Sequence, residues 1–202
     1  ALLDESPLKT TGELPDLSGI DMLELTPEMM EFLEEHIDND LSQPARLQSL
    51  LNAVMGEDHF ELIYDDSTRT ASETFREQHG NCLSFTNMFI AMARHIGLDA
   101  SYQEVEIAPE WSAAGQSFLL SQHVNVFVDF KGHYTPRVVD FNFSYEPDIK
   151  MEFDLVYDHA VITDQRARAH YFNNLGVELM LYGGSTQLAL ANYRQSLRED
   201  SG

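Results

Sequence analysis

Cysteine is nearly absent from this chain: Cys82 is the only one among 202 residues. A single thiol cannot form an internal disulfide, and it leaves the redox compartment open. Long apolar runs are also lacking, since no segment reaches the roughly 20 residues that a membrane-spanning helix needs, and we therefore expect no membrane insertion. Glycine-rich phosphate loops and Gly-x-Ser-x-Gly motifs are missing as well, so these signatures of nucleotide binding and of serine hydrolases do not apply.

Positive charge is scarce too. The chain holds 12 Lys and Arg against 34 Asp and Glu, which gives a formal net charge of −22. Residues 1–66 contain 17 acidic residues and only Lys9 and Arg46 as basic ones. Because such a surface is repelled by phosphate backbones and by anionic membranes, we expect no nucleic-acid partner. The charge is interpreted as a means of solubility rather than as an acidic docking face, and no Asp-x-Asp-x-Asp-Gly calcium loop accompanies it.

The apolar content of 43% is enough for the core of one ordinary domain with a small appendage. Residues 1–25 are predicted to form an extended acidic lead-in, because prolines and glycines interrupt them. Residues 26–163 are predicted to form the main domain, and residues 164–202 a helical hairpin.

Helix signals dominate the first half of the main domain. Thr26-Pro27-Glu28 combines a capping hydroxyl, a proline at the first helical position and an acid. Thr70-Ala71-Ser72-Glu73 matches a capping box. Together with the apolar stripes, these signals predict four helices, at about 27–37, 44–55, 71–78 and 82–97. The fourth is apolar over most of its surface, which indicates a central position in the core.

After Gly97 the apolar period changes from 3.6 to 2, which indicates strands. We predict three of them, over residues 100–107, 123–130 and 137–143. The segment 108–122 contains Pro109, Trp111 and Gly115 and is predicted to be a long loop. Loops of that length are often functional, so this one is a candidate wall or lid of a site.

The helical period returns near residue 165, where two helices are predicted over 165–182 and 185–199. Their spacing of apolar and small residues resembles a tetratricopeptide helix pair: Phe172, Leu175, Gly176, Leu179, Ala189, Tyr193, Ser196 and Leu197. A single repeat cannot bury its own face, so the pair is expected to pack on the main domain, continue into further repeats or bind a protein partner. The alternative is a simple helical hairpin of the domain itself.

Cys82 lies where the Gly80-Asn81 break meets the start of the apolar helix. A lone cysteine is usually a small core residue. Here, however, the sulfur faces the positive end of a helix dipole, which favours the thiolate, and the free N–H groups of the first turn are able to hold an oxyanion. Cys82 is therefore a candidate nucleophile for acyl transfer.

Two further residues follow in an order that suits a catalytic triad. His123 lies on a strand whose other face is made of valines, and Asp140 lies in an apolar run where a carboxylate needs a partner. A turn centred on residues 131–132 brings the two strands side by side, because eight residues separate each side chain from that turn. The pairing predicts His123 as a base that Asp140 holds in one tautomer.

The order Gly80-Asn81-Cys82, Gln122-His123 and Val139-Asp140 resembles the transglutaminase-like superfamily, a papain-related group of cysteine proteins. The resemblance covers about residues 60–145. It implies an α+β papain/transglutaminase-like core with N-terminal helices, a central cysteine-bearing helix packed on an antiparallel sheet, and a C-terminal helical hairpin. It also implies that Cys82 is the nucleophile, His123 the general base and acid, and Asp140 the orienting group.

The resemblance further implies cysteine-dependent acyl transfer on a protein or peptide amide through a thioester. Hydrolysis, as by a peptidase or amidase, is favoured over cross-linking, because transfer needs an additional amine site. Gln122 and then Asn125 are candidate oxyanion donors, and Trp111 is a candidate pocket wall. No cofactor and no metal is expected.

With the C-terminal helix pair, the resemblance points to bacterial transglutaminase-like proteins with tetratricopeptide repeats, and the periplasm or cell envelope is favoured over the cytoplasm. Two alternatives stay open. One is a non-catalytic peptide-binding or scaffold protein with the same fold. The other is a zinc site made of His79, Cys82, His123 and Asp140, although their spacing is unusual for zinc ligands.

Overall fold

The computed structural model describes residues 13–56, 60–114, 117–132, 134–141 and 159–200, and over 106–122 it describes the backbone alone. The chain divides into two compact units. The larger unit is Asp21–Ala167, and the smaller one combines Ala1–Ile20 with Arg168–Gly202. The domain boundaries expected from the sequence, at residues 26 and 164, stay a prediction.

The larger unit begins with three helices that the sequence signals predicted: α1 (Pro27–His36), α2 (Gln43–Met55) and α3 (Ala71–Glu77). Thr26 caps α1 by accepting a hydrogen bond from the Met29 N–H. Thr70 and Glu73 form both hydrogen bonds of the predicted capping box at α3. Two short parallel strands, β1 (Ile63–Tyr64) and β2 (His79–Gly80), pair on either side of α3 in the sequence.

The main sheet of the described residues has four strands in the order β5-β4-β3-β6, all antiparallel to their neighbours. The strands are β3 (Asp99–Ala114), β4 (Ser117–Asp129), β5 (Arg137–Val139) and β6 (His159–Ile162). β6 is an addition to the prediction. β5 is shorter than the predicted strand over 137–143, because Asp140 and Phe141 follow it without strand pairing; residues 142–143 lie outside the described part.

The prediction of a loop over 108–122 is wrong for the described residues. β3 continues to Ala114 and β4 begins at Ser117, so most of this segment is a long hairpin. The register between the two strands shifts between Val105 and Glu110. Pro109 lies inside this irregularity, where its missing N–H does not interrupt a regular ladder. Pro109 therefore lies within β3, and the strand continues beyond it.

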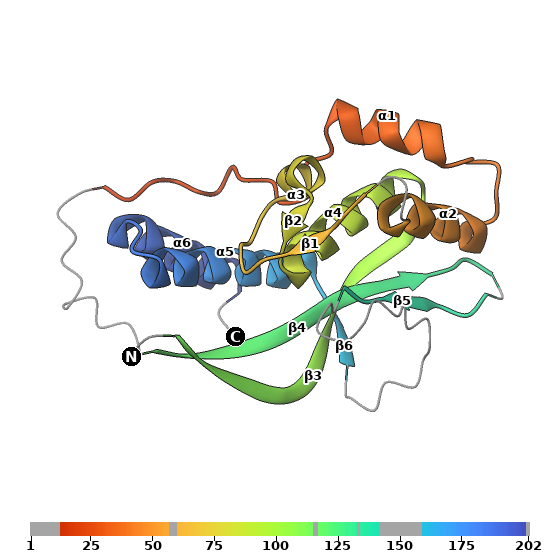
Figure 1. Cartoon of the computed structure of the whole chain (residues 1–202). Coiled ribbons are helices and arrows are strands. Elements are labelled where there is room, and N and C mark those ends of the chain that lie inside the picture. Colours follow the sequence, from red (N-terminus) through yellow and green to blue (C-terminus); the bar gives the residue numbers. More distant parts are fainter. Residues whose placement is uncertain (1–12, 57–59, 115–116, 133, 142–158, 201–202) are drawn as a thin grey trace. The chain divides into compact units, whose positions relative to one another are not determined.

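The helix α4 (Cys82–His95) is the centre of the larger unit. Every residue from Leu83 to Ala93 is buried. The helix contacts α1 and α3, and it also contacts β3 and β4 of the sheet, so it lies between the N-terminal helices and the sheet (Figure 1). Burial on all sides explains why its sequence is apolar over most of its surface. The structure confirms the predicted α+β fold with a central cysteine-bearing helix on an antiparallel sheet.

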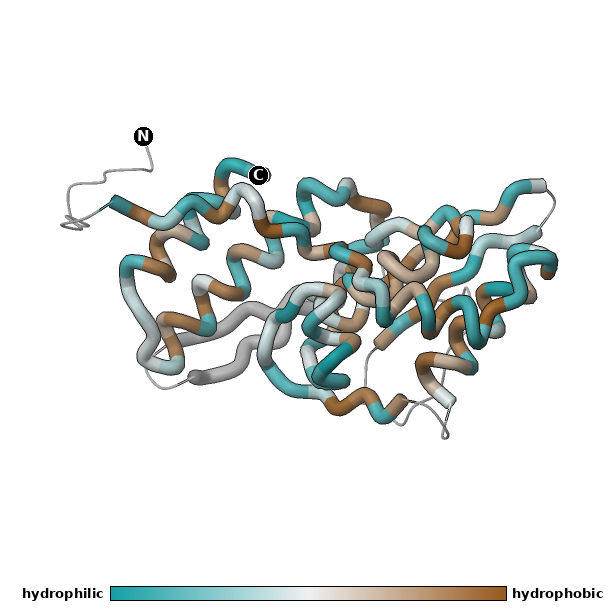
Figure 2. Tube along the Cα trace, turned by 90° about the horizontal axis from the view of Figure 1, so that it is seen from above, coloured by the Kyte–Doolittle hydropathy of each residue, from teal (hydrophilic) through white to brown (hydrophobic). Residues whose placement is uncertain are grey.

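The smaller unit is built on α5 (Asp164–Leu181, of which Arg168 onward belongs to this unit) and α6 (Thr186–Glu199). Both helices alternate hydrophilic and apolar segments at the left of Figure 2. A Cβ at Gly176 would come within 2.7 Å of the Tyr193 ring, so glycine lets the two helices approach closely. The Ser196 hydroxyl donates to the Ala169 carbonyl at 2.8 Å. Within the described residues, no helix is both long and apolar enough to cross a bilayer.

Candidate active site

Asn81 fixes the start of the cysteine-bearing helix. It is the N-cap of α4, and its side-chain oxygen accepts a hydrogen bond from the Ser84 N–H at 3.0 Å. Its side-chain nitrogen donates to the Thr68 hydroxyl at 2.7 Å. The cap is buried, so both of its polar ends need these partners. Asn81 therefore ties the helix end that carries Cys82 to the preceding segment.

Ser84 makes the second tie between these segments. Its buried hydroxyl accepts a hydrogen bond from the Arg69 N–H at 2.9 Å and donates to the Ser67 carbonyl at 3.1 Å. A Cβ added at Gly80 would lie 2.5 Å from the Ser84 Cβ. Glycine at position 80 is therefore what allows the chain to pass so close to the first turn of the helix.

The first turn of α4 presents free backbone donors beside the sulfur. The N–H groups of Ser84 and Phe85 bond to Asn81, whereas those of Cys82 and Leu83 have no hydrogen-bond partner among the described residues. Such amides at the positive end of a helix stabilise a negatively charged oxygen. Cys82 is itself partly exposed, whereas Leu83 is buried.

His123 and Asp140 meet on the sheet. His123 lies on β4 opposite Val105 of β3, and Asp140 is the first residue after β5. The His123 Nε2 atom lies 2.6 Å from Asp140 Oδ1. Their side chains are 12% and 25% exposed, so the pair is largely shielded from water and a short charge-assisted hydrogen bond is favoured.

Apolar packing holds the Asp140 segment against the cysteine-bearing helix. Phe141 is 1% exposed, and its ring centroid lies 6.0 Å from that of Phe85 and 5.6 Å from that of Phe89, both on α4. The Thr86 hydroxyl of the same helix donates to the carbonyl of Val124, the neighbour of His123, at 3.4 Å. The helix and both strands that carry the site are thus fixed to one another within a few residues of it.

The protonation of His123 follows from these contacts. Burial disfavours the imidazolium and lowers the pKa of His123, but the hydrogen bonds to Asp140 and Cys82 and the charges of those two groups outweigh burial and raise it to about 10. Asp140 occupies Nε2, which leaves Nδ1 as the ring nitrogen for the sulfur. Asp140 and Cys82 therefore both favour the protonated form of the ring.

The other predicted site residues are less well defined. Gln122 lies on β4 and Trp111 on β3, and the structure describes only their backbones. Asn125 is completely buried, opposite Gln103 of β3. Both side-chain polar atoms of Asn125 and the Gln103 side-chain oxygen lack a hydrogen-bond partner within the described residues. The roles of Gln122, Asn125 and Trp111 stay predictions.

The contact that His79 makes is with Asp65, since its Nδ1 atom lies 3.8 Å from Asp65 Oδ2. Among the described residues, no group of three or more His, Cys, Asp and Glu side chains is arranged to hold a metal ion. The zinc alternative, which needed His79 together with Cys82, His123 and Asp140, has no such cluster in this part of the chain.

Sequence reasoning missed how the helix start is held. Gly80-Asn81 was interpreted only as a break, although Asn81 followed three residues later by Ser84 is a capping signal. The Thr68 and Ser67 contacts had no local signal, since they join residues 13 and 17 positions apart.

The sequence pattern of the transglutaminase-like superfamily matches residues 32–138, slightly more than half of the chain, and the protein belongs to this superfamily. The matched range contains α4 and His123, and it ends just before Asp140. Comparisons with curated proteins and with solved structures found no match.

Proposed function

We propose that this protein is a cysteine-dependent enzyme that cleaves an amide of a protein or peptide through a thioester intermediate. Cys82 is the nucleophile, His123 the general acid and base, and Asp140 the group that orients His123. The observation that carries the proposal is that the His123 Nε2 atom lies 2.6 Å from Asp140 Oδ1, while Cys82 acts with Asp140 to raise the pKa of the same imidazole. Membership of a superfamily of cysteine-based acyltransferases and peptidases supports it.

In the first half-reaction, the Cys82 sulfur attacks the amide carbonyl carbon as a thiolate, the form that an adjacent imidazolium favours. A carbon–sulfur bond forms, and the carbonyl oxygen becomes an oxyanion near the Cys82 and Leu83 N–H groups. The carbon–nitrogen bond then breaks, and the His123 proton passes to the leaving amine. A thioester and a neutral imidazole remain.

In the second half-reaction, His123 takes a proton from water, and the resulting hydroxide attacks the thioester carbon. The carbon–sulfur bond breaks, a carboxylic acid leaves, and the thiolate–imidazolium pair is restored. Asp140 keeps the ring in one orientation throughout, since it holds Nε2–H while Nδ1 gains and loses the proton.

The reactivity of the only thiol tests this proposal directly. Iodoacetamide at pH 6 is expected to label Cys82 of the folded chain at least about tenfold faster than Cys82 of the same chain in urea, because an ordinary thiol has pKa near 8.5 and reacts slowly at this pH. Intact mass measures the labelling, and every label reports on one site. Equal labelling rates for the folded and the urea-unfolded chain would contradict the enzymatic proposal. The non-catalytic peptide-binding or scaffold protein would then be the function that remains for this fold.

Hydrolysis is proposed over cross-linking because water is always present, whereas transfer needs a bound amine. A glutamine-rich unfolded protein with a fluorescent primary amine separates the two. Release of new amino termini or of ammonia without incorporated amine supports hydrolysis, and incorporation of the amine supports transfer.

The C-terminal helices are proposed as a surface for a protein partner. Met180, Tyr182 and Leu197 are 55%, 71% and 48% exposed. The tetratricopeptide-like spacing on α5 and α6 is the reason for this proposal. The proposal would be supported by a protein partner that binds the full chain through residues 164–202. Replacing Tyr182 by serine should then abolish the binding.

A further inference from the structure

A short two-stranded sheet leads directly into the nucleophile. β1 pairs with β2 in parallel, so that Ile63 lies opposite His79 and Tyr64 opposite Gly80. Gly80 precedes Cys82 by two residues. Tyr64 therefore lies on the strand next to β2, which ends two residues before Cys82, although Tyr64 precedes Cys82 by 18 positions in the sequence.

The backbone of Tyr64 faces away from β2. The Ile63 N–H donates to the Gln78 carbonyl at 2.8 Å, and the Asp65 N–H donates to the Gly80 carbonyl at 3.0 Å. Because the direction of these groups alternates along a strand, the Tyr64 N–H and C=O point to the opposite side. Within the described residues neither group has a hydrogen-bond partner. Among the residues that the structure describes, β1 thus has an open edge, to which an extended peptide is able to add as a strand.

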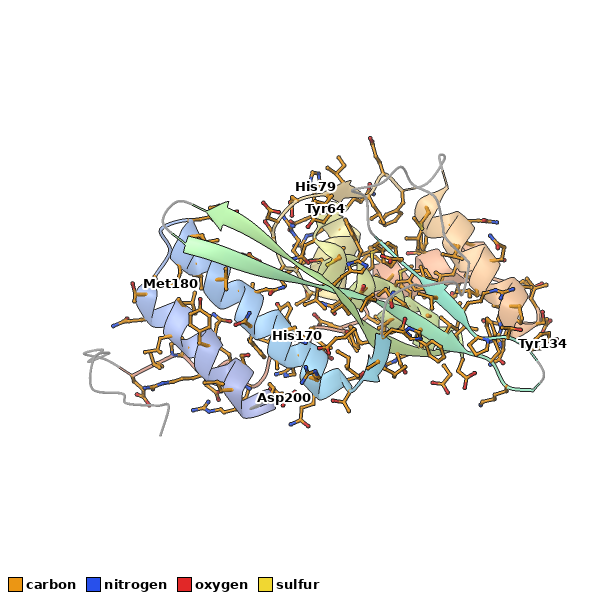
Figure 3. The ribbon with its side chains drawn as sticks, turned by 90° about the horizontal axis from the view of Figure 1, so that it is seen from below. Tyr64, His79, Tyr134, His170, Met180 and Asp200 are labelled. Carbon is orange, nitrogen blue, oxygen red and sulfur yellow. The ribbon has the colours of Figure 1, made fainter. Side chains whose placement is uncertain are left out.

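The side chains of this edge are apolar, large and exposed. Ile63 is 44% exposed and Tyr64 50% exposed. Figure 3 shows Tyr64 and His79 together at one margin of the view, whereas Tyr134, which is 53% exposed, lies at another. Burial and then the charges of Cys82, Asp66 and Asp65 raise the pKa of the Tyr64 phenol. The ring is in contact with solvent, and the pairing of β1 with β2 is the geometry that relates Tyr64 to the segment before Cys82.

The edge is flanked by negative charge. Asp66 and Glu61 are exposed, and within the described residues neither forms an ion pair, unlike Asp65, which pairs with Arg69. Two unpaired carboxylates on either side of Ile63 and Tyr64 favour a cationic group on whatever lies along this strand.

We propose that the open edge of β1 binds the extended segment of the peptide substrate that carries the attacked amide, with Tyr64 contacting a side chain next to that amide and with Asp66 and Glu61 favouring a lysine or arginine there. The inference rests on the proposed function, since it names the substrate class of the same site. It assigns Tyr64 to substrate selection and not to bond breaking.

Two reagents separate docking from thiol reactivity. Acetyl-Ala-Ala-Lys chloromethyl ketone alkylates a thiolate with loss of chloride, and it carries a short peptide that can bind along the edge of β1. Iodoacetamide also alkylates a thiolate but carries no peptide. Replacing Tyr64 by alanine is expected to lower the ratio of the two second-order rate constants about tenfold, because a central aromatic contact is lost. Tyr64→Phe keeps the ring and should keep the ratio within about twofold. Tyr134→Ala, at an equally exposed tyrosine, is the matched control.

The charge and the backbone contact have tests of their own. The chloromethyl ketone with lysine should react about two- to fivefold faster than the same reagent with glutamate in place of lysine. The D66N/E61Q double variant should remove this preference. Among three reagents that are each methylated on one peptide nitrogen, one should react about tenfold more slowly than the parent, since it loses the bond to the Tyr64 carbonyl.

The outcomes distinguish the two proposals. A wild-type thiol that reacts with iodoacetamide no faster than the unfolded chain overturns both of them. A reactive thiol whose reagent ratio is the same in wild type, Tyr64→Ala and Tyr134→Ala overturns the docking edge alone. The same holds if Tyr64→Ala slows both reagents equally, because Tyr64 would then act on the thiol itself.

Discussion

The start of α4 and the helical hairpin of the smaller unit use buried polar side chains in different ways. Around α4 the bonds join distant segments: Asn81 donates to Thr68, and Tyr102 donates to Asn87 at 2.7 Å. In α6 the buried Asn192 and Gln195 bond within their own helix, to Leu188 and Glu199. Long-range bonds fix where two segments lie, whereas bonds within a helix stabilise that helix alone.

The difference shows why the proposed chemistry belongs to the first region. A buried polar group without a partner costs about 1–3 kcal/mol, so each long-range bond is satisfied in only a narrow range of geometries. Asn81 and Asn87 therefore restrict the cysteine-bearing helix to one position against its neighbours. A site that needs a sulfur, an imidazole and a carboxylate in contact depends on such restriction.

The largest expected effect is on the thiol. His123→Gln removes the cation next to Cys82, and we expect the iodoacetamide labelling rate at pH 6 to fall about 100-fold. His170→Gln, in the hairpin helix α5, is the comparison and should leave the rate within about twofold. Intact mass spectra over time measure both. An equal loss in the two variants would mean that the labelling rate reports on folding and not on the imidazole.

The second comparison uses two buried phenylalanines. Phe141, against α4, is 1% exposed, and Phe172, in the hairpin, is 0% exposed. Replacing either by alanine should cost about 3–5 kcal/mol of unfolding free energy, because each leaves a cavity. Only Phe141→Ala should also slow the labelling of Cys82, since Phe141 holds the Asp140 segment against the helix. Urea unfolding followed by circular dichroism, with labelling in native buffer, separates the two quantities.

Should Phe172→Ala slow the labelling as much as Phe141→Ala does, the contrast between the region that bears the candidate active site and the helical hairpin would not hold. A smaller truncation, Phe141→Leu, keeps the chain folded if the alanine variant does not fold, and it should still give a measurable decrease in labelling.

Local signals predicted the helices well and the strands less well. Capping residues such as Thr70 act over three positions, so α3 was located from sequence alone. The hairpin over 108–122 was predicted as a loop, because Pro109 and Gly115 are turn signals and a register irregularity that accommodates a proline leaves no local pattern. β6 is four residues long and mostly exposed, so neither length nor alternation indicated it.

The site was predictable only where chain geometry is simple. His123 lies on β4 and Asp140 directly follows β5, and counting residues from the turn was enough to predict that the two side chains lie close. The strand register itself, with Val126 opposite Val139, differs by two residues from the one that this count implies. The contact of Cys82 with His123 joins α4 to β4, a relation that depends on the packing of the whole core, and only the resemblance to a family suggested it. Tyr64 was not singled out, because a strand of two residues has no periodicity.

The third prediction concerns the charge of His123. Its pKa is about 10 in the folded protein and near 6.5 in an unfolded chain, so the protonated ring stabilises the fold fully below pH 6.5. That contribution is lost as the pH rises toward 10, with a slope of at most about 1.4 kcal/mol per pH unit. Asp140→Asn removes a hydrogen bond and a charge that raise the pKa, so the unfolding free energy of the variant should depend less on pH over this interval.

Urea unfolding at several pH values between 6 and 10 measures this dependence. The wild-type curve minus the variant curve isolates the His123 contribution from other titrating groups. Cys82, the other group that acts on the ring, is checked with Cys82→Ser in the same way. Parallel curves for wild type and Asp140→Asn would contradict the raised pKa.

The smallest expected effects come from two helix caps, one in each region. Thr70 and Glu73 exchange two hydrogen bonds at the start of α3, whereas Ser185 accepts one from Leu188 at the start of α6. Thr70→Ala should cost about 1 kcal/mol and Ser185→Ala somewhat less, as urea midpoints would show. Because α3 is followed closely by β2, and β2 ends two residues before Cys82, a frayed α3 also loosens the segment that leads to the sulfur. Thr70→Ala should therefore lower the rate at which the Ala-Ala-Lys chloromethyl ketone labels Cys82 by more than its small stability cost explains. Ser185→Ala should not lower this rate. Equal reagent rates in the two variants would show that the start of α4 is held by Asn81 and Ser84 without help from α3.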